Sequence, residues 1–167
     1  LQNYLEQGNG TIFFSATLLP VRYYKSLLSV EEDDYAIYVE SSFSRENRLI
    51  LLGRDVSTKY TRRGPEMYRR IAEYILCTAK SRRGNYIAFF PSYRMLEEVY
   101  EYFRQEKGDM ESAAQTQYMS EKEREEFLEL FETERRESFV GFCVMGGIFS
   151  EGIDLAEERL IGAVIVG

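Results

Sequence analysis

The residues best suited to chemistry form a glycine-rich loop, residues 146–155, near the end of the chain. Its glycines and polar side chains are Gly146, Gly147, Ser150, Glu151, Gly152 and Asp154. Glycine permits close backbone approach and positive φ, so that backbone N–H groups can cradle a phosphate. Apolar runs at 139–145 and 160–166 flank the loop and predict two short buried strands. We therefore predict that this loop senses nucleotide and nucleic acid.

Two further predicted strands end in hydroxyl side chains. The β-prone run 11–14 is followed by Ser15 and Thr17, before a helix that we expect to begin near Pro20. Thr17 either bridges a phosphate site to a neighbouring loop or caps that helix. The apolar run 85–90 leads to Ser92 and Tyr93. Ser92 can cap the next helix while its amides meet a phosphate, so both interpretations use the same helix end.

Strand, loop and helix alternate from Pro65 onward, which predicts an α/β fold with an open parallel sheet. The expected helices are 65–80, one after Ser92, and one opened by a capping box of Ser120 and Glu123. Short strands are also expected at 35–39, 48–52 and 111–117. Because ligands of such sheets bind at the carboxyl ends of the strands, we expect the loops of Thr17, Ser92–Tyr93 and 150–154 to converge.

Composition excludes several kinds of site. The chain has 167 residues, enough for one domain with a real core, and no histidine, so Ser–His and Cys–His catalysis are excluded. The two cysteines, Cys77 and Cys143, cannot ligate an iron–sulfur cluster, and their apolar contexts predict buried thiols in a reducing compartment. Without a signal peptide or a run of about 20 apolar residues, we expect a cytoplasmic protein without membrane contact. The first residue is not Met and the last lies in a strand-like run, which we interpret as an excised piece of a longer protein.

The charge is segregated along the chain. The net charge is −7, yet residues 41–94 hold 12 Lys/Arg against 4 Asp/Glu, whereas residues 95–137 hold 6 against 14. The basic segment, which includes Arg62 and Arg63, can meet a phosphate backbone. Alternatively, these arginines coat solvated helix faces and pair with the acidic half.

Several of these stretches resemble helicase motifs. Ser15-Ala16-Thr17-Leu18 is similar to motif III, Phe89-Phe90-Pro91-Ser92-Tyr93 to motif IV, and residues 146–155 to motif V of the DinG/XPD-like superfamily 2 DNA helicases. Residues 42–48 resemble the segment joining the two motor domains, and residues 57–63 resemble a stretch of bacterial members. The similarity covers about residues 11–167, and motif V is its most specific part.

The resemblance implies a RecA-like domain of an ATP-dependent DNA helicase that translocates 5′ to 3′ on single-stranded DNA, with a role in DNA repair. Residues 1–20 would end the first motor domain, 21–64 would connect, and 65–167 would form the second domain, truncated before motif VI. ATP and Mg²⁺ would bind between this domain and the missing N-terminal motor domain. An iron–sulfur cluster is compatible with the longer protein but not with these residues.

The resemblance also assigns roles to individual residues. Ser15 and Thr17 would couple hydrolysis to DNA movement, and Gly152 and Asp154 would lie toward the nucleotide. The expected DNA contacts are Arg62, Arg63, Ser92, Tyr93, Gly147, Ser150 and Glu151. Because the chain holds no G-x-x-x-x-G-K-[ST] loop, Asp-Glu-x-His box or motif VI, we expect no catalytic residue in it and no ATPase activity from these residues alone. The alternative function is a non-catalytic α/β interaction module, and a Rossmann-type enzyme is disfavoured because no G-x-G-x-x-G follows the first strand.

Overall fold

The computed structural model describes residues 2–15, 18–28, 34–40, 43–150 and 153–167. The chain divides into two compact units, Leu1–Ile50 and Leu51–Gly167, which we call unit 1 and unit 2 and describe separately. The boundary between them falls inside the predicted connecting segment 21–64. None of the helices in the described part of the chain has the length and apolar character needed to cross a bilayer.

Unit 1 contains two short helices, α1 (Gln2–Leu5) and α2 (Val21–Leu28), and the 3-10 turn η1 (Arg45–Asn47). The helix predicted after Pro20 is confirmed, and the Pro20 carbonyl accepts the Tyr24 amide at 3.4 Å. The strands predicted at 11–14, 35–39 and 48–52 are wrong, because the structure assigns these residues no strand. Their apolar side chains are exposed: Phe14 by 90% and Tyr35 by 99%. A β-prone run forms a strand only where a ladder partner exists, and no described segment supplies one here.

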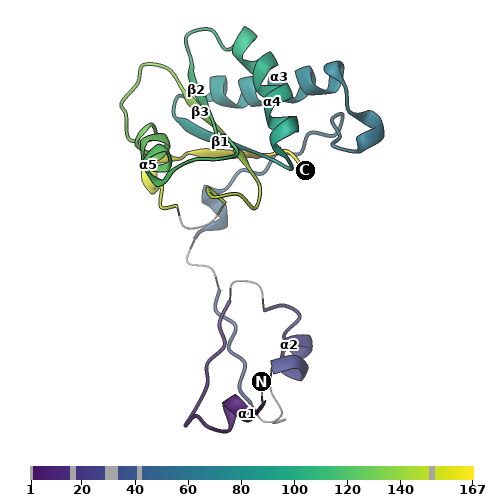
Figure 1. Cartoon of the computed structure of the whole chain (residues 1–167), viewed down its shortest axis with the longest axis vertical. Helices are drawn as coiled ribbons and strands as arrows, with labels where there is room; N and C mark the ends of the chain where they lie inside the picture. The colour runs from purple at the N-terminus through teal and green to yellow at the C-terminus, as the bar shows by residue number, and fades with distance from the viewer. Residues whose placement is uncertain (1, 16–17, 29–33, 41–42, 151–152) are drawn as a thin grey trace. The chain divides into compact units, whose positions relative to one another are not determined.

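Unit 2 is built on the predicted parallel sheet, in the order β2-β3-β1-β4 (Figure 1). The strands are β1 (Asn85–Phe90), β2 (Glu111–Ala114), β3 (Phe139–Val144) and β4 (Gly162–Ile165). β1 pairs with β3 from Asn85↔Phe139 and with β4 from Tyr86↔Gly162. The two central strands, β1 and β3, lie in the apolar runs 85–90 and 139–145, as expected for parallel strands that are covered on both faces. The run 160–166 forms β4 at the edge of the sheet, where half-buried and exposed residues alternate, so the prediction that this strand is buried is wrong.

Three helices cover the sheet: α3 (Pro65–Ser81), α4 (Tyr93–Glu106) and α5 (Glu121–Glu129). The 3-10 turns η2 (Tyr60–Arg62) and η3 (Glu157–Arg159) lie in the connections before α3 and before β4. The predicted capping box of α5 is confirmed, because the Ser120 hydroxyl accepts the Glu123 amide at 3.3 Å and the Glu123 carboxylate accepts the Ser120 amide at 2.7 Å. The Ser120 amide, followed by the Ser120 hydroxyl, which also donates to the carboxylate at 2.7 Å, holds the pKa of Glu123 below its usual value.

The period-two pattern of the strands separates two cores. Even-numbered residues of β1 and β3, such as Ala88 and Phe142, pack with α3 and α4. Odd-numbered residues, such as Ile87 and Cys143, pack with Phe127 of α5. α5 lies on the other side of the sheet from α3 and α4 (Figure 1).

The two cysteines differ in their surroundings. Cys143 is buried, as predicted, and burial raises the pKa of its thiol to about 12. The prediction for Cys77 is wrong, because this thiol is exposed. The buried stripe of α3 runs through Ile71, Ile75 and Ala79, and Cys77 falls outside that helical spacing.

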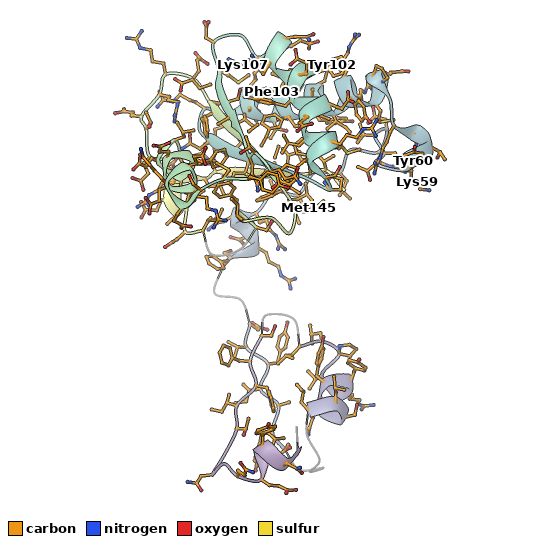
Figure 2. All side chains as sticks on the ribbon, viewed as in Figure 1. Lys59, Tyr60, Tyr102, Phe103, Lys107 and Met145 are labelled. Carbon is orange, nitrogen blue, oxygen red and sulfur yellow. The ribbon has the colours of Figure 1, made fainter. Side chains whose placement is uncertain are left out.

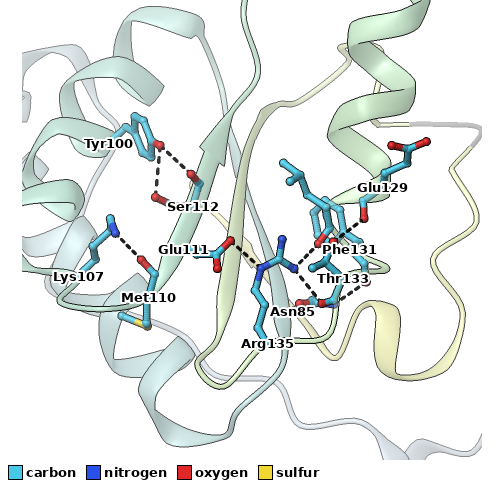
Figure 3. Close-up of polar contacts among 11 residues, drawn as sticks. Asn85, Tyr100, Lys107, Met110, Glu111, Ser112, Glu129, Phe131, Thr133 and Arg135 are labelled. Atoms are coloured by element: carbon cyan, nitrogen blue, oxygen red, sulfur yellow. Dashed lines mark hydrogen bonds and ion pairs between the residues drawn. The ribbon is translucent and has the colours of Figure 1, made fainter.

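Side chains close the amino ends of the strands (Figure 3). The guanidinium of Arg135, only 7% exposed, donates to Glu111 at 2.9 Å and to the carbonyls of Leu130 and Thr133. The same guanidinium lies 4.5 Å from the ring centroid of Phe139. These contacts join the start of β2, the loop after α5 and the start of β3.

Two more buried or half-buried polar side chains complete this end of the sheet. Asn85 donates to the Phe131 carbonyl at 2.8 Å (Figure 3). The hydroxyl of Ser138, which is 3% exposed, donates to the Ala79 carbonyl at 2.7 Å and accepts the Gly84 amide at 3.3 Å. Asn85, Arg135 and Ser138 therefore hold the amino ends of the strands to neighbouring segments.

Candidate functional site

In parallel α/β folds ligands bind in a crevice outside the carboxyl ends of the strands, and we use that word for the edge of the sheet where β1 and β3 end. The two strands are neighbours, but the chain leaving β1 enters α4, on the face of Phe142. The chain leaving β3 packs Ile148 and Phe149 on the opposite face. Connections that diverge between adjacent strands mark a topological switch point, which is where such folds place their ligands.

At the end of β1, Ser92 is the N-cap of α4, as predicted. Its backbone is extended, with φ −163°, and its hydroxyl accepts the Met95 amide at 3.3 Å. Tyr93 follows as the first residue of the helix, and both side chains are half-buried. A serine before a helix predicts the cap. Because this helix follows β1, the cap and Tyr93 lie at the carboxyl end of that strand.

At the end of β3, the chain makes a tight turn that needs glycine. Gly146 has φ 69°, the left-handed region that glycine adopts readily. A Cβ on Gly147 would lie 2.9 Å from the Val144 carbonyl oxygen, so the backbone passes too closely for any side chain. The Ser150 hydroxyl donates to the same carbonyl at 3.1 Å. The positive φ at Gly146 and the close backbone approach at Gly147 confirm those two parts of the prediction, while the contact with a phosphate stays a prediction.

The turn is fixed to the sheet by one aromatic side chain. Phe149 is 2% exposed, and its ring stacks on Phe127 of α5 at 4.5 Å between centroids. This contact leaves Gly147 and Ser150 half-buried at the crevice.

Gln115 joins the two loops, and the sequence analysis did not identify it. This residue follows β2, is 3% exposed, and accepts the Val144 amide at 3.0 Å through Oε1. Its Nε2 donates to the Tyr93 hydroxyl oxygen at 2.9 Å. Gln115 therefore brings together Tyr93 of the β1 loop and Val144 at the base of the β3 loop.

Asp154 lies in a different environment. It is exposed and lines a groove of about 360 Å³ beside Glu125, Glu129 and Glu132. This is the acidic surface of α5, on the face of the sheet opposite α4. Its assignment to a nucleotide remains a prediction.

Some of the remaining predicted site residues belong to unit 1 or lie outside the described residues. Ser15 lies in unit 1 and is exposed. Thr17, Glu151 and Gly152 lie outside the described residues, so their predicted roles stay predictions.

Arg62 and Arg63 lie in the segment that precedes α3. Arg63 donates from Nε to the Thr58 carbonyl at 2.9 Å and lies 5.9 Å from the ring of Tyr60. Arg62 is exposed, and so are Lys59 and Tyr60, which project from unit 2 (Figure 2). Arg63 thus shapes the turn η2, while Arg62 presents its charge to solvent.

A second set of contacts holds the same segment against α3. Asp55 accepts from Tyr74 and, at 2.8 Å, from Arg70. The hydrogen bond from Tyr74, followed by that from Arg70, lowers the pKa of the Asp55 carboxyl. The exposed turn is therefore anchored at its base.

Metal ligands are not gathered in the described residues. No group of three or more His, Cys, Asp or Glu side chains there is arranged to hold a metal ion. Cys77 on α3 and Cys143 on β3 lie in separate environments, so these residues do not fit an iron–sulfur cluster.

Comparisons with known proteins agree with the fold and the motifs. Over 162 residues the chain is 27% identical to a probable ATP-dependent helicase of Methanocaldococcus jannaschii, covering 95% of this chain and 24% of that protein. Over 91 residues it is 28% identical to the ATP-dependent DNA helicase XPD of Sulfolobus acidocaldarius, covering 53% of this chain and 16% of that protein. The chain therefore spans about a quarter or less of the length of these relatives.

Two solved structures share the fold. One, an apo form of XPD, is 23% identical with a TM-score of 0.53, covering 68% of this chain and 22% of that chain. The other, an XPD helicase, is 24% identical with a TM-score of 0.54, covering 68% and 19%. Residues 75–167, which include the whole sheet from β1 to β4, match the pattern of the helicase C-terminal domain. The chain belongs to the helicase C-terminal domain family.

Proposed function

We propose that this chain supplies part of an ATP-dependent DNA helicase that couples ATP hydrolysis to 5′-to-3′ translocation on single-stranded DNA and to duplex unwinding. The observation that carries the proposal is the crevice at the carboxyl ends of β1 and β3. There Gln115 joins Tyr93 to Val144, at the base of the turn that holds Gly147 and Ser150. The membership of residues 75–167 in a helicase domain family supports the same function.

The crevice suits a nucleic-acid backbone because it offers small residues and hydroxyl groups. Hydroxyls and backbone amides are common partners of phosphate oxygens, and they position a strand without reading its sequence. Ser92 and Tyr93 have hydroxyl protons that their bonds to Met95 and Gln115 do not use. Gly147 and Ser150 donate to the Val144 carbonyl, through N–H and O–H at 3.1 Å each, and would exchange that partner for a phosphate oxygen when the strand binds. Glu151 would join them. Arg62 adds a cation on the exposed segment before α3.

Hydrolysis itself requires groups from another domain. ATP with Mg²⁺, when bound, supplies the phosphoryl-transfer chemistry, and the phosphate-binding lysine and metal-binding hydroxyl would come from the first motor domain. In this proposal Gly152 and Asp154 report which nucleotide is bound, and Ser15 and Thr17 couple hydrolysis to movement.

The salt dependence of DNA binding tests the nucleic-acid part. In the full-length protein, Arg62→Ala should reduce the slope of log K against log salt for a labelled single-stranded oligonucleotide by about 0.7, the value for one phosphate contact. Lys122→Ala is a matched control, because Lys122 is 84% exposed and lies on the acidic helix α5. Equal slopes for Arg62→Ala and the unaltered protein would show that Arg62 coats a solvated surface and contacts no phosphate.

ATP hydrolysis tests the division of labour between domains. We expect no turnover of radiolabelled ATP by the 167 residues alone. In the full-length protein, Asp154→Ala should lower the rate of hydrolysis while the melting temperature is kept. Loss of folding instead would show that Asp154 is a structural turn residue. Unwinding of a duplex with a 5′ overhang, compared with a 3′ overhang, measures the direction.

A further inference from the structure

The orientation of the Gln115 side chain fixes the direction of a hydrogen bond at the crevice. The amide of Val144 can only donate, so the Gln115 atom that it contacts at 3.0 Å must be the oxygen. The other end of the side-chain amide is therefore the NH₂ group, which donates to the Tyr93 hydroxyl oxygen at 2.9 Å. The backbone N–H of Val144 thus makes the Tyr93 hydroxyl the acceptor in its hydrogen bond with Gln115.

The Tyr93 hydroxyl consequently acts as an acceptor toward Gln115, and its own proton is not used in that bond. A phenol has a single O–H proton, which can then be donated elsewhere. Tyr93 is half-buried at the crevice, beside the N-cap Ser92. Gln115 is 3% exposed, so water does not compete for its two hydrogen bonds.

The turn after β3 is shaped around the same side chain. A Cβ on Gly147 would lie 3.1 Å from Nε2 of Gln115 and 2.9 Å from the Val144 carbonyl oxygen. The backbone N–H of Gln115 also donates to the Phe142 carbonyl at 2.8 Å, and this bond fixes the Gln115 backbone to β3. The position of Gln115 is therefore held by β3 and by the close approach of the glycine turn.

We propose that Gln115 is a positioning residue that presents the Tyr93 hydroxyl as a hydrogen-bond donor to a phosphate oxygen of the nucleic-acid strand. This inference rests on the proposed function for its ligand, but the hydrogen-bond arrangement stands on the structure alone. Gln115 touches no ligand itself and acts through Tyr93.

Replacement by glutamate reverses the hydrogen bond at nearly constant shape. In Gln115→Glu the carboxylate still accepts the Val144 amide, but it can only accept from Tyr93, whose proton then turns inward. The full-length Gln115→Glu protein should bind a labelled oligo-dT about tenfold more weakly, the effect of losing a hydrogen bond to a charged group. Tyr93→Phe should show a similar loss, and the double variant should be no weaker than the weaker single variant.

Gln117→Glu is the matched control, because it adds the same charge two residues along the chain at an exposed side chain. It reports the effect of charge alone. If Gln115→Glu and Gln117→Glu weaken binding equally, or if Tyr93→Phe binds like the unaltered protein, the proposal is wrong. Additive losses in the double variant would also overturn it.

Hydrogen exchange separates failure of this inference from failure of the proposed function. Gln115→Met removes the acceptor of the Val144 amide and should speed exchange in the peptide around residue 144, whereas Gln115→Glu should not. Should the unaltered protein not bind oligo-dT, the proposed function fails, while this exchange pattern still tests the arrangement around Gln115. Equal exchange in Gln115→Met and the unaltered protein would contradict the arrangement itself. Gln115→Met also serves where Gln115→Glu does not fold, and its loss of binding should exceed that of Gln117→Glu.

Discussion

The two ends of the sheet in unit 2 use polar side chains for different purposes. At the amino ends, Asn85, Arg135 and Ser138 bind backbone carbonyls and neighbouring side chains, and the guanidinium of Arg135 is almost fully buried. At the carboxyl ends, Gln115 is equally buried, but Tyr93 and Ser150 remain half-buried at the crevice. Buried polar side chains thus stabilise both ends of the same strands, but at the carboxyl end the Tyr93 O–H proton is not used in its bond with Gln115.

Removal of Arg135 should have the largest effect on stability. Arg135→Ala leaves Glu111 and two backbone carbonyls without this donor and removes the contact with the Phe139 ring. We expect the free energy of unfolding of unit 2 to fall by about 2–4 kcal/mol, as for loss of a buried hydrogen-bonded charge. Urea denaturation measures this. The affinity of the folded fraction for single-stranded DNA should not change, and a large loss of affinity would show that the two ends are not separate.

Two serines, one at each end of the sheet, allow the effects on stability and on binding to be measured separately. Ser138 and Ser150 each donate a hydroxyl to a backbone carbonyl, at 2.7 Å to Ala79 and at 3.1 Å to Val144. Ser138→Ala should cost about 1–2 kcal/mol of stability, because the buried Gly84 contact is also lost. Ser150→Ala should cost less stability, because Ser150 is only half-buried. It should weaken binding to a labelled single-stranded oligonucleotide, since in the proposed complex the Ser150 proton turns from the Val144 carbonyl to a phosphate oxygen. Equal effects of the two changes in both measurements would remove the distinction between the ends.

The smallest effect on stability is expected at Asp55. This residue lies at neither end of the sheet, and its contacts are exposed to solvent. The Tyr74 and Arg70 hydrogen bonds lower the pKa of Asp55 in the folded protein. The contribution of Asp55 to the free energy of unfolding is therefore present above the unfolded pKa of about 3.9, and it is lost as the pH falls through the lower folded pKa. Asp55→Asn should therefore flatten the pH dependence of the melting temperature only in that acidic range. Added salt should weaken the difference, because Arg70 and Asp55 are both more than a third exposed.

Features that depend on local sequence were predictable. The N-cap Ser92, the capping box of Ser120 and Glu123, and the helix beginning at Pro65 each rest on residues within one helical turn. The central strands followed from long apolar runs. The turn at Gly146 and Gly147 followed from the conformational freedom of glycine.

Features that depend on distant partners were not predictable. The runs 11–14, 35–39 and 48–52 have strand composition, but pairing is a property of the whole sheet and not of a run. Gln115 carries no local signal, since its contact with Val144 follows from the register that places Ala114 opposite Phe142. Cys77 was mispredicted because an apolar neighbourhood along the chain does not show which side of a helix a residue occupies.

The exposed runs of unit 1 have a practical consequence for handling the protein. Segments that have strand composition but form no strand, with exposed Tyr35, Ile37 and Val39, are templates for pairing with another chain. At the concentrations used for crystallisation or spectroscopy, such segments favour association between copies, which begins in unit 1 while the sheet of unit 2 stays folded.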